Sequence, residues 1–194
     1  MWLFANQIAG YGSLKQNNLM ATYQSIRDTD HIIGNKDAPI SLIEYGDFQC
    51  PHCGRAYPII KNILQNLEGN LLFIYRHFPL SKVHPEARMA AVAAEAADRQ
   101  GLFWEMYNML FENQRQLKND AIMRYAGMIG LNLEQFESDI QDEVLHKKVE
   151  NDFLDGLKSG VNGTPTFFVN GEKYEDSWDG KRLEEYLHSL IVIR

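Results

Sequence analysis

The chain has 194 residues, 45% of them hydrophobic, and a formal net charge of −7 at pH 7. This size suits one globular domain, or one domain with a large insertion. The acidic balance, without a long basic run, argues against nucleic acid or an anionic membrane surface as a partner, and no apolar run approaches the roughly 20 residues of a membrane span.

Residues 1–30 are weakly patterned, and we predict an N-terminal extension with a short helix around Leu19–Arg27. The apolar opening Met1–Ala5 has no basic residue before it and fades within a few positions, so we predict no signal peptide. We therefore expect either a cytosolic protein or a sequence without its leader. A loop of turn-forming residues follows at 34–39.

Residues 40–78 have the pattern of a strand, a helix and a second strand. Ile40–Tyr45 is apolar on both faces, as expected for a strand in a sheet that helices cover on both sides. From Pro51 to Leu67, apolar residues recur at helical spacing, and proline fits the first helical position because its missing N–H is not needed there. Leu71–Tyr75 is the second predicted strand.

Residues 79–160 are helical in period, and we predict a bundle of five helices. The first, Pro85–Arg99, is rich in alanine, which lets neighbouring helices approach closely, so we place it at the centre of the bundle. Asn132 followed three residues later by Gln135 resembles a capping box that opens the fourth helix.

From residue 161 the period returns to that of strands. Thr166–Val169 and Glu172–Tyr174 flank Asn170-Gly171, a strong hairpin turn signal, and an amphipathic helix ends the chain. The order of elements predicts an α/β domain interrupted by helices. Its two parts are residues 31–78 and 161–194, with residues 79–160 as the insertion.

The only two cysteines, Cys50 and Cys53, lie at the predicted junction of strand and helix with Pro51 and His52 between them. A CxxC pair beside a β-α-β pattern favours redox chemistry. Because a helix N-terminus stabilises a thiolate, we expect Cys50 to face solvent as the nucleophile and Cys53 to close or resolve the disulfide. His52 should stabilise the thiolate further, which makes the disulfide more oxidising.

A zinc site is the alternative interpretation of the pair. Zinc usually has four ligands, whereas the chain offers two cysteines and six histidines without the close spacing of a zinc finger. His52, inside the tetrad, is poorly placed to complete such a site. We therefore predict no metal and no cofactor beyond the redox-active Cys50–Cys53 pair.

The run Glu44–Gln49 before the CPHC tetrad, and Gly163–Phe168 later, resemble the DsbA-like thiol:disulfide oxidoreductases of the thioredoxin superfamily. CPHC is the tetrad of DsbA itself. The run from Tyr75 to Met106 is similar to thioredoxin-like domains found alone or fused to some sodium/proton antiporters. The resemblance covers about residues 31–191 and implies a thioredoxin fold with a helical-bundle insertion between its β-α-β and β-β-α halves.

The resemblance also implies roles for individual residues. Cys50 and Cys53 match the nucleophilic and resolving cysteines. Thr164-Pro165 matches a loop whose cis proline packs on the dithiol and whose backbone binds substrate peptide by strand addition. Glu44 matches a buried acid that relays a proton to or from Cys53 with a raised pKa. The residues alone leave open an exposed strand carboxylate at Glu44 and an ordinary turn before Pro165.

We therefore predict a thiol:disulfide oxidoreductase that exchanges a Cys50–Cys53 disulfide with protein thiols as a disulfide donor. Its partners would be thiol-containing proteins or peptides and a redox protein that reoxidises or reduces the dithiol. Two alternatives remain at this point. One is a cytosolic reductase or redox sensor, and the other is a chaperone-like peptide-binding module beside Thr164-Pro165 in which the dithiol is incidental.

Overall fold

The structure of the chain is a computed structural model, which describes residues 24–192. The helix predicted around Leu19–Arg27 lies partly outside these residues, and residues 24–27 are irregular rather than helical. Within the described part of the chain, no helix combines the length and the apolar character needed to cross a membrane.

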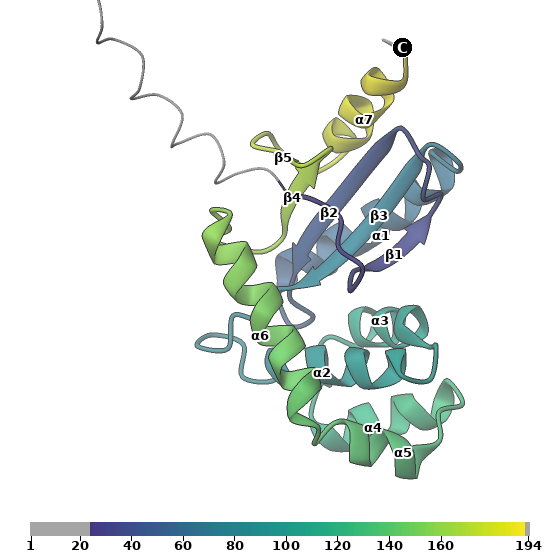
Figure 1. The fold of residues 1–194 in the computed structure, drawn as a ribbon, viewed down its shortest axis with the longest axis vertical. Helices are drawn as coiled ribbons and strands as arrows, with labels where there is room; N and C mark the ends of the chain where they lie inside the picture. Colours follow the sequence, from purple (N-terminus) through teal and green to yellow (C-terminus); the bar gives the residue numbers. More distant parts are fainter. Residues whose placement is uncertain (1–23, 193–194) are drawn as a thin grey trace, which may run out of the picture.

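A five-stranded sheet forms the centre of the fold (Figure 1). Its strands are β1 (His31–Gly34), β2 (Ile40–Gly46), β3 (Leu71–His77), β4 (Thr166–Val169) and β5 (Glu172–Lys173), in the order β1-β3-β2-β4-β5. Only β2 and β3 are parallel, and helix α1 (Pro51–Asn66) makes the crossover that a parallel pair requires. This is the thioredoxin fold that the resemblance implied.

Strand β1 has no counterpart among the predicted elements. It pairs antiparallel with β3, with His31 opposite Tyr75 and Gly34 opposite Leu72. Four residues are too few to show an alternating pattern, and the segment becomes a strand because the edge of β3 supplies its hydrogen-bond partners.

The five helices predicted between the two halves are present. They are α2 (Ala87–Asp98), α3 (Phe103–Glu112), α4 (Asn119–Met128), α5 (Leu133–Asp139) and α6 (Glu143–Lys158). Helix α2 contacts the other four, and its alanines are buried, so the central position predicted for it is confirmed. Asn132 caps α5 by accepting a hydrogen bond from the Gln135 N–H at 3.0 Å, while the Gln135 side chain donates to Asp139 instead of completing the capping box.

Two layers of helix cover the sheet. On one face, α1, α3 and α7 (Arg182–Val192) enclose a core that includes Leu42 and Phe73. On the other face, the neighbouring residues Ile43 and Ile74 pack with Phe153 of α6. Figure 1 shows α6 running from the sheet down to the cluster of α2–α5, so one helix joins the two parts of the molecule.

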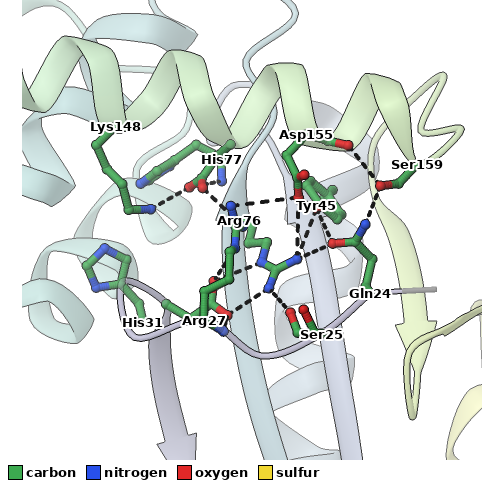
Figure 2. A network of polar contacts seen from close by, with 12 residues as sticks. Gln24, Ser25, Arg27, His31, Tyr45, Arg76, His77, Lys148, Asp155 and Ser159 are labelled. Carbon is green, nitrogen blue, oxygen red and sulfur yellow. Dashed lines mark hydrogen bonds and ion pairs between the residues drawn. The ribbon is translucent and has the colours of Figure 1, made fainter. Parts of the chain in front are cut away.

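A buried polar layer lies between α6 and the sheet, and the segment from Gln24 to Asp30 closes it (Figure 2). At its centre the Arg76 side chain is fully buried, and its guanidinium donates to both carboxylate oxygens of Asp30, at 2.8 and 2.7 Å. Arg76 also donates to Gln24 and, at 3.1 Å, to the Tyr45 hydroxyl. Residues just before β1 are therefore part of the packed fold.

Candidate active site

Helix α1 begins at Pro51, and Cys50 is its N-cap residue with extended backbone angles. The helix has no side-chain cap, so the N–H groups of its first turn are available to the Cys50 sulfur. Both cysteines are free thiols. The expectation that Cys50 faces solvent is wrong: its side chain is 3% exposed, because the carbonyl of Thr164 lies 3.4 Å from its sulfur and the loop before β4 covers it.

The two thiols have opposite titration behaviour. A hydrogen bond from the Cys53 thiol, aided by the backbone N–H groups of Cys53 and His52, outweighs burial and lowers the pKa of Cys50 to about 5. Burial raises the pKa of Cys53 well above its ordinary value, and the negative charges of Glu44 and Cys50 add to that effect. Only Cys50 is therefore a thiolate at neutral pH.

Glu44 lies on β2 with its side chain on the α1 face of the sheet, and it is 1% exposed. Neither carboxylate oxygen has a hydrogen-bond partner among the residues that the structure describes. Burial, together with the charge of Cys50, raises the pKa of Glu44 to about 8. The side chain is a buried acid that is mostly protonated at neutral pH, not an exposed strand carboxylate.

The loop at Thr164-Pro165 lies against the dithiol, although it is more than a hundred residues away in sequence. Its Thr164–Pro165 peptide bond is cis. Thr164 is buried and Pro165 half-buried, and β4 begins at the next residue as the antiparallel neighbour of β2. The sheet thus brings together the loop and the tetrad.

His52 lies on the exposed side of α1. Its ring Nδ1 is 2.8 Å from the Arg55 guanidinium, which donates to it. The part of His52 that acts on the Cys50 thiolate in this geometry is its backbone N–H.

Two further residues hold the active-site turn, and no role is predicted for either of them from the sequence. The Asp47 N–H donates to the Cys53 sulfur at 3.4 Å, and the Asp47 carboxylate accepts from the Leu80 N–H at 2.9 Å and lies 2.7 Å from the His84 ring. Gln114, after α3, donates to the carbonyl of Cys50 at 3.0 Å. Asp47 is close to the tetrad in sequence and could have been suspected, whereas no local pattern points to Gln114.

A second cluster of titratable side chains lies where β1, β3 and α2 meet. The Nε2 atoms of His31 and His77 are both 2.8 Å from one carboxylate oxygen of Glu95, a spacing that could hold a metal ion. The ammonium of Lys148 is 3.7 Å from the same oxygen, and hydrogen bonds to Asp98 and Glu95 outweigh burial and raise the pKa of His31 to about 9. Protonated His31 and Lys148 already supply the positive charge, which favours a buried ion cluster that ties the sheet to the insertion.

Solved structures of other proteins share this fold. The chain is similar to BdbD from Bacillus subtilis in its oxidised form, with a TM-score of 0.78, 22% identity and coverage of 89% of this chain and 97% of that one. It is also similar to α-DsbA1 from Wolbachia pipientis, with a TM-score of 0.74, 24% identity and coverage of 87% and 94%. At these identities the likeness shows a shared DsbA-like fold.

Curated relatives are similar over one segment. The chain is 44% identical over 159 residues to Na(+)/H(+) antiporter NhaA 1 of Mycobacterium sp. strain KMS, and 41% identical over 165 residues to the protein of that name in Salinispora arenicola. These matches cover 80% and 85% of this chain but only 26% and 25% of the relatives. The chain thus spans about a quarter of their length.

Fold and site together define a thioredoxin-fold protein with a CxxC dithiol at the start of its first helix and a helical insertion beside it. The model of the family described as Thioredoxin matches residues 27–189. The chain belongs to this family.

Proposed function

We propose that the protein is a thiol:disulfide oxidoreductase that donates a Cys50–Cys53 disulfide to protein thiols. One observation carries the proposal: within one helical turn, the pKa of Cys50 is lowered while the pKa of Cys53 is raised. A stable Cys50 thiolate is a good leaving group and favours the reduced dithiol, which makes the disulfide an oxidant.

The proposed reaction has two exchanges. A substrate thiolate attacks the Cys50 sulfur, the Cys50–Cys53 bond breaks, and Cys53 leaves with the electron pair and takes up a proton. A second substrate thiolate then attacks the substrate sulfur of the mixed disulfide and releases Cys50 as a thiolate. The substrate loses two electrons and two protons, and the protein dithiol gains the electrons.

Glu44 is suited to supply the proton in the first exchange. Its pKa of about 8 keeps it protonated at neutral pH. When ionised, Glu44 raises the pKa of Cys53, so the two groups lie close together inside the core. Because Cys53 is 0% exposed, water reaches its sulfur poorly, and a buried acid is the better proton source.

The extended segment around Thr164-Pro165 supports a polypeptide substrate. The loop covers Cys50 and leads directly into β4, so a peptide in extended form could lie beside it and present a cysteine to the dithiol. A redox protein that reoxidises Cys50 and Cys53 after each cycle would use the same surface.

The direction of exchange is tested by equilibrating the protein with glutathione buffers and trapping its thiols. We expect a midpoint well above that of thioredoxin, which is about −270 mV. A midpoint as reducing as that of thioredoxin would replace the donor with the reductase or redox-sensor alternative.

Catalysis itself is tested with oxidised protein and reduced ribonuclease. We expect Cys50→Ser to abolish the oxidation of ribonuclease. Cys53→Ser, given disulfide-bonded ribonuclease instead, should accumulate a mixed disulfide: Cys50 attacks a substrate disulfide, one substrate thiolate leaves, and Cys53 is not there to resolve the product. Full activity of Cys50→Ser would show that the dithiol is incidental and would favour the peptide-binding module.

A further inference from the structure

Gln114 is the residue of the helical insertion that contacts the backbone of the nucleophile. It lies in the turn after α3, and its Nε2 donates to the carbonyl of Phe48 at 2.8 Å and to the carbonyl of Cys50 at 3.0 Å. One amide group therefore holds the chain on both sides of Gln49, directly before α1.

The Cys50 carbonyl is the atom whose direction sets the geometry of the site. Cys50 has φ −68° and ψ 122°, outside the helical region, while Pro51 already belongs to α1. Rotation about ψ of Cys50 would swing α1, with the N–H groups of His52 and Cys53, relative to the Cys50 sulfur. A donor fixed on the Cys50 carbonyl limits this rotation, in addition to the first helical bond from Gly54 N–H at 3.1 Å.

Gly54 leaves the space that the Gln114 side chain uses. A Cβ atom at Gly54 would overlap the side-chain oxygen of Gln114. Gly54 has no positive φ that would require glycine, and glycine in a helix interior is less favourable than alanine by about 1 kcal/mol. The close approach of Gln114 is the structural reason for glycine at this position.

We infer that Gln114, supplied by the insertion, is a positioning residue for Cys50: it fixes the backbone around the nucleophile and keeps the sulfur over the free N–H groups of α1. The inference rests on the proposed function, because it concerns the reactivity of the same thiolate. It makes the insertion a part of the catalytic site, since the bundle that begins after β3 holds the carbonyl of the reactive cysteine.

The test measures the pKa of Cys50 from the pH dependence of its alkylation, together with the equilibrium constant with glutathione. Gln114→Ala removes both hydrogen bonds and should raise that pKa by about half a unit to one unit, a roughly three- to tenfold loss of thiolate below the pKa. Gln114→Glu cannot donate and adds a negative charge, so its shift should be larger. Gln116→Ala, an exposed glutamine in the same loop, is the matched control and should change neither quantity.

Gly54→Ala gives an independent readout that a purely structural role would not produce. The added methyl group should displace Gln114 and raise the pKa of Cys50, although alanine favours the helix and the melting temperature need not fall. In the Gln114→Ala background the same substitution should leave the pKa unchanged, because the displaced side chain is already gone.

Two outcomes would overturn the inference. One is a Gln114→Ala variant with the wild-type pKa and glutathione equilibrium and only a lower melting temperature. The other is an equal effect of Gly54→Ala in both backgrounds. If Cys50 of the wild type titrated like an ordinary thiol, the proposed function as a disulfide donor would itself be contradicted. The failure of that proposal is therefore distinguishable from the failure of the role inferred for Gln114.

Discussion

At the scale of single residues, the chemistry of the site comes from two sulfur atoms in different surroundings. The Cys50 thiolate accepts a hydrogen bond from the Cys53 thiol and lies next to the N–H groups of α1, which also favour it. Cys53 points into the core toward Glu44 and has no comparable compensation for burial. The same helical turn therefore holds one reactive thiolate and one protonated thiol.

Replacing Glu44 with glutamine tests the buried acid. Because the folded-state pKa of Glu44 is raised to about 8, the stability it contributes is present below its ordinary value of 4.5 and is lost as the pH rises through 8. Glu44→Gln should therefore be more stable than wild type at pH 8 by about 2–4 kcal/mol, but not at pH 4. Ribonuclease oxidation should slow several-fold, because glutamine cannot supply a proton.

Urea denaturation at pH 4, 6 and 8 measures the stability difference. Glu68→Gln, at an exposed position in the turn after α1, is the control and should show no such trend. A Glu44→Gln variant whose stability relative to wild type did not depend on pH would contradict a titrating acid at this position.

At the scale of elements, α6 and the segment from Gln24 to Asp30 enclose the back of the sheet. The Arg76 guanidinium between them is fully buried, and burial alone would raise the pKa of Asp30, yet Arg76 and Arg27 hold that pKa below its ordinary value. A buried pair of this kind contributes little net stability when intact, but it leaves an uncompensated charge when one partner is removed.

Asp30→Ala should therefore destabilise the protein by about 3–5 kcal/mol. The expected result is a lower urea midpoint at pH 7. Asp28→Ala, two residues earlier and exposed, should leave the midpoint within experimental error. Equal midpoints for Asp30→Ala and wild type would mean that the segment before β1 adds nothing to the packed fold.

Gly156 lies on α6 where this helix packs tightly against Tyr45 of β2 and against Phe78, just after β3. A Cβ atom there would lie 2.8 Å from the Phe78 ring and 3.0 Å from the Tyr45 ring. Gly156→Ala should therefore cost about 1–3 kcal/mol through overpacking, more than the helix gains from alanine. Gly127→Ala in α4 is the matched control, because its nearest neighbour is 3.9 Å away, and it should stabilise the protein slightly.

Thermal melts of the two glycine variants give the comparison directly. The prediction is a lower melting temperature for Gly156→Ala and an equal or higher one for Gly127→Ala. If both variants were stabilised, α6 would have room to move away from the sheet, and the tight contact would have no energetic consequence.

At the scale of the whole molecule, the insertion and the sheet form one structure around the dithiol. The ion cluster of His31, His77 and Glu95 joins β1 and β3 to α2, α6 packs on both parts, and Gln114 reaches the active-site turn. The division of the chain into an insertion at residues 79–160 and a surrounding domain stays a prediction from the sequence. Each of these contacts joins the insertion to the surrounding domain.

Global stability should depend on both redox state and pH. The pKa of Cys50 is lowered from 9.0 to about 5 in the reduced fold, so the stability it contributes is complete above pH 9 and is lost as the pH falls through 5. The oxidised protein has no such thiol. The melting temperature of the reduced form minus that of the oxidised form should therefore rise by roughly 5 °C or more between pH 5 and pH 9.

Differential scanning calorimetry of both forms at three pH values measures this trend. Cys50→Ser is the control, since its stability should not show the rise that the reduced wild type shows. A constant difference between the two wild-type forms across this range would contradict a lowered thiolate pKa.

The sequence by itself determined the order of elements, because periods of two and of 3.6 residues and turn signals depend on near neighbours. The five helices of the insertion, the hairpin after Val169 and the tetrad at the start of a helix follow from such local patterns. The strand β1 did not, since four residues carry too little pattern, and neither did the structured segment at Gln24–Asp30.

The tertiary structure alone decided how the site is assembled. It buried Cys50 under the Thr164 loop, settled Glu44 as an inward-facing acid, and brought Gln114 to the nucleophile from 64 residues away. Burial and hydrogen bonding between distant segments depend on how strands pair and helices pack, and no window of neighbouring residues contains that information. The sequence therefore predicted which atoms react, while packing decided their protonation and what holds them in place.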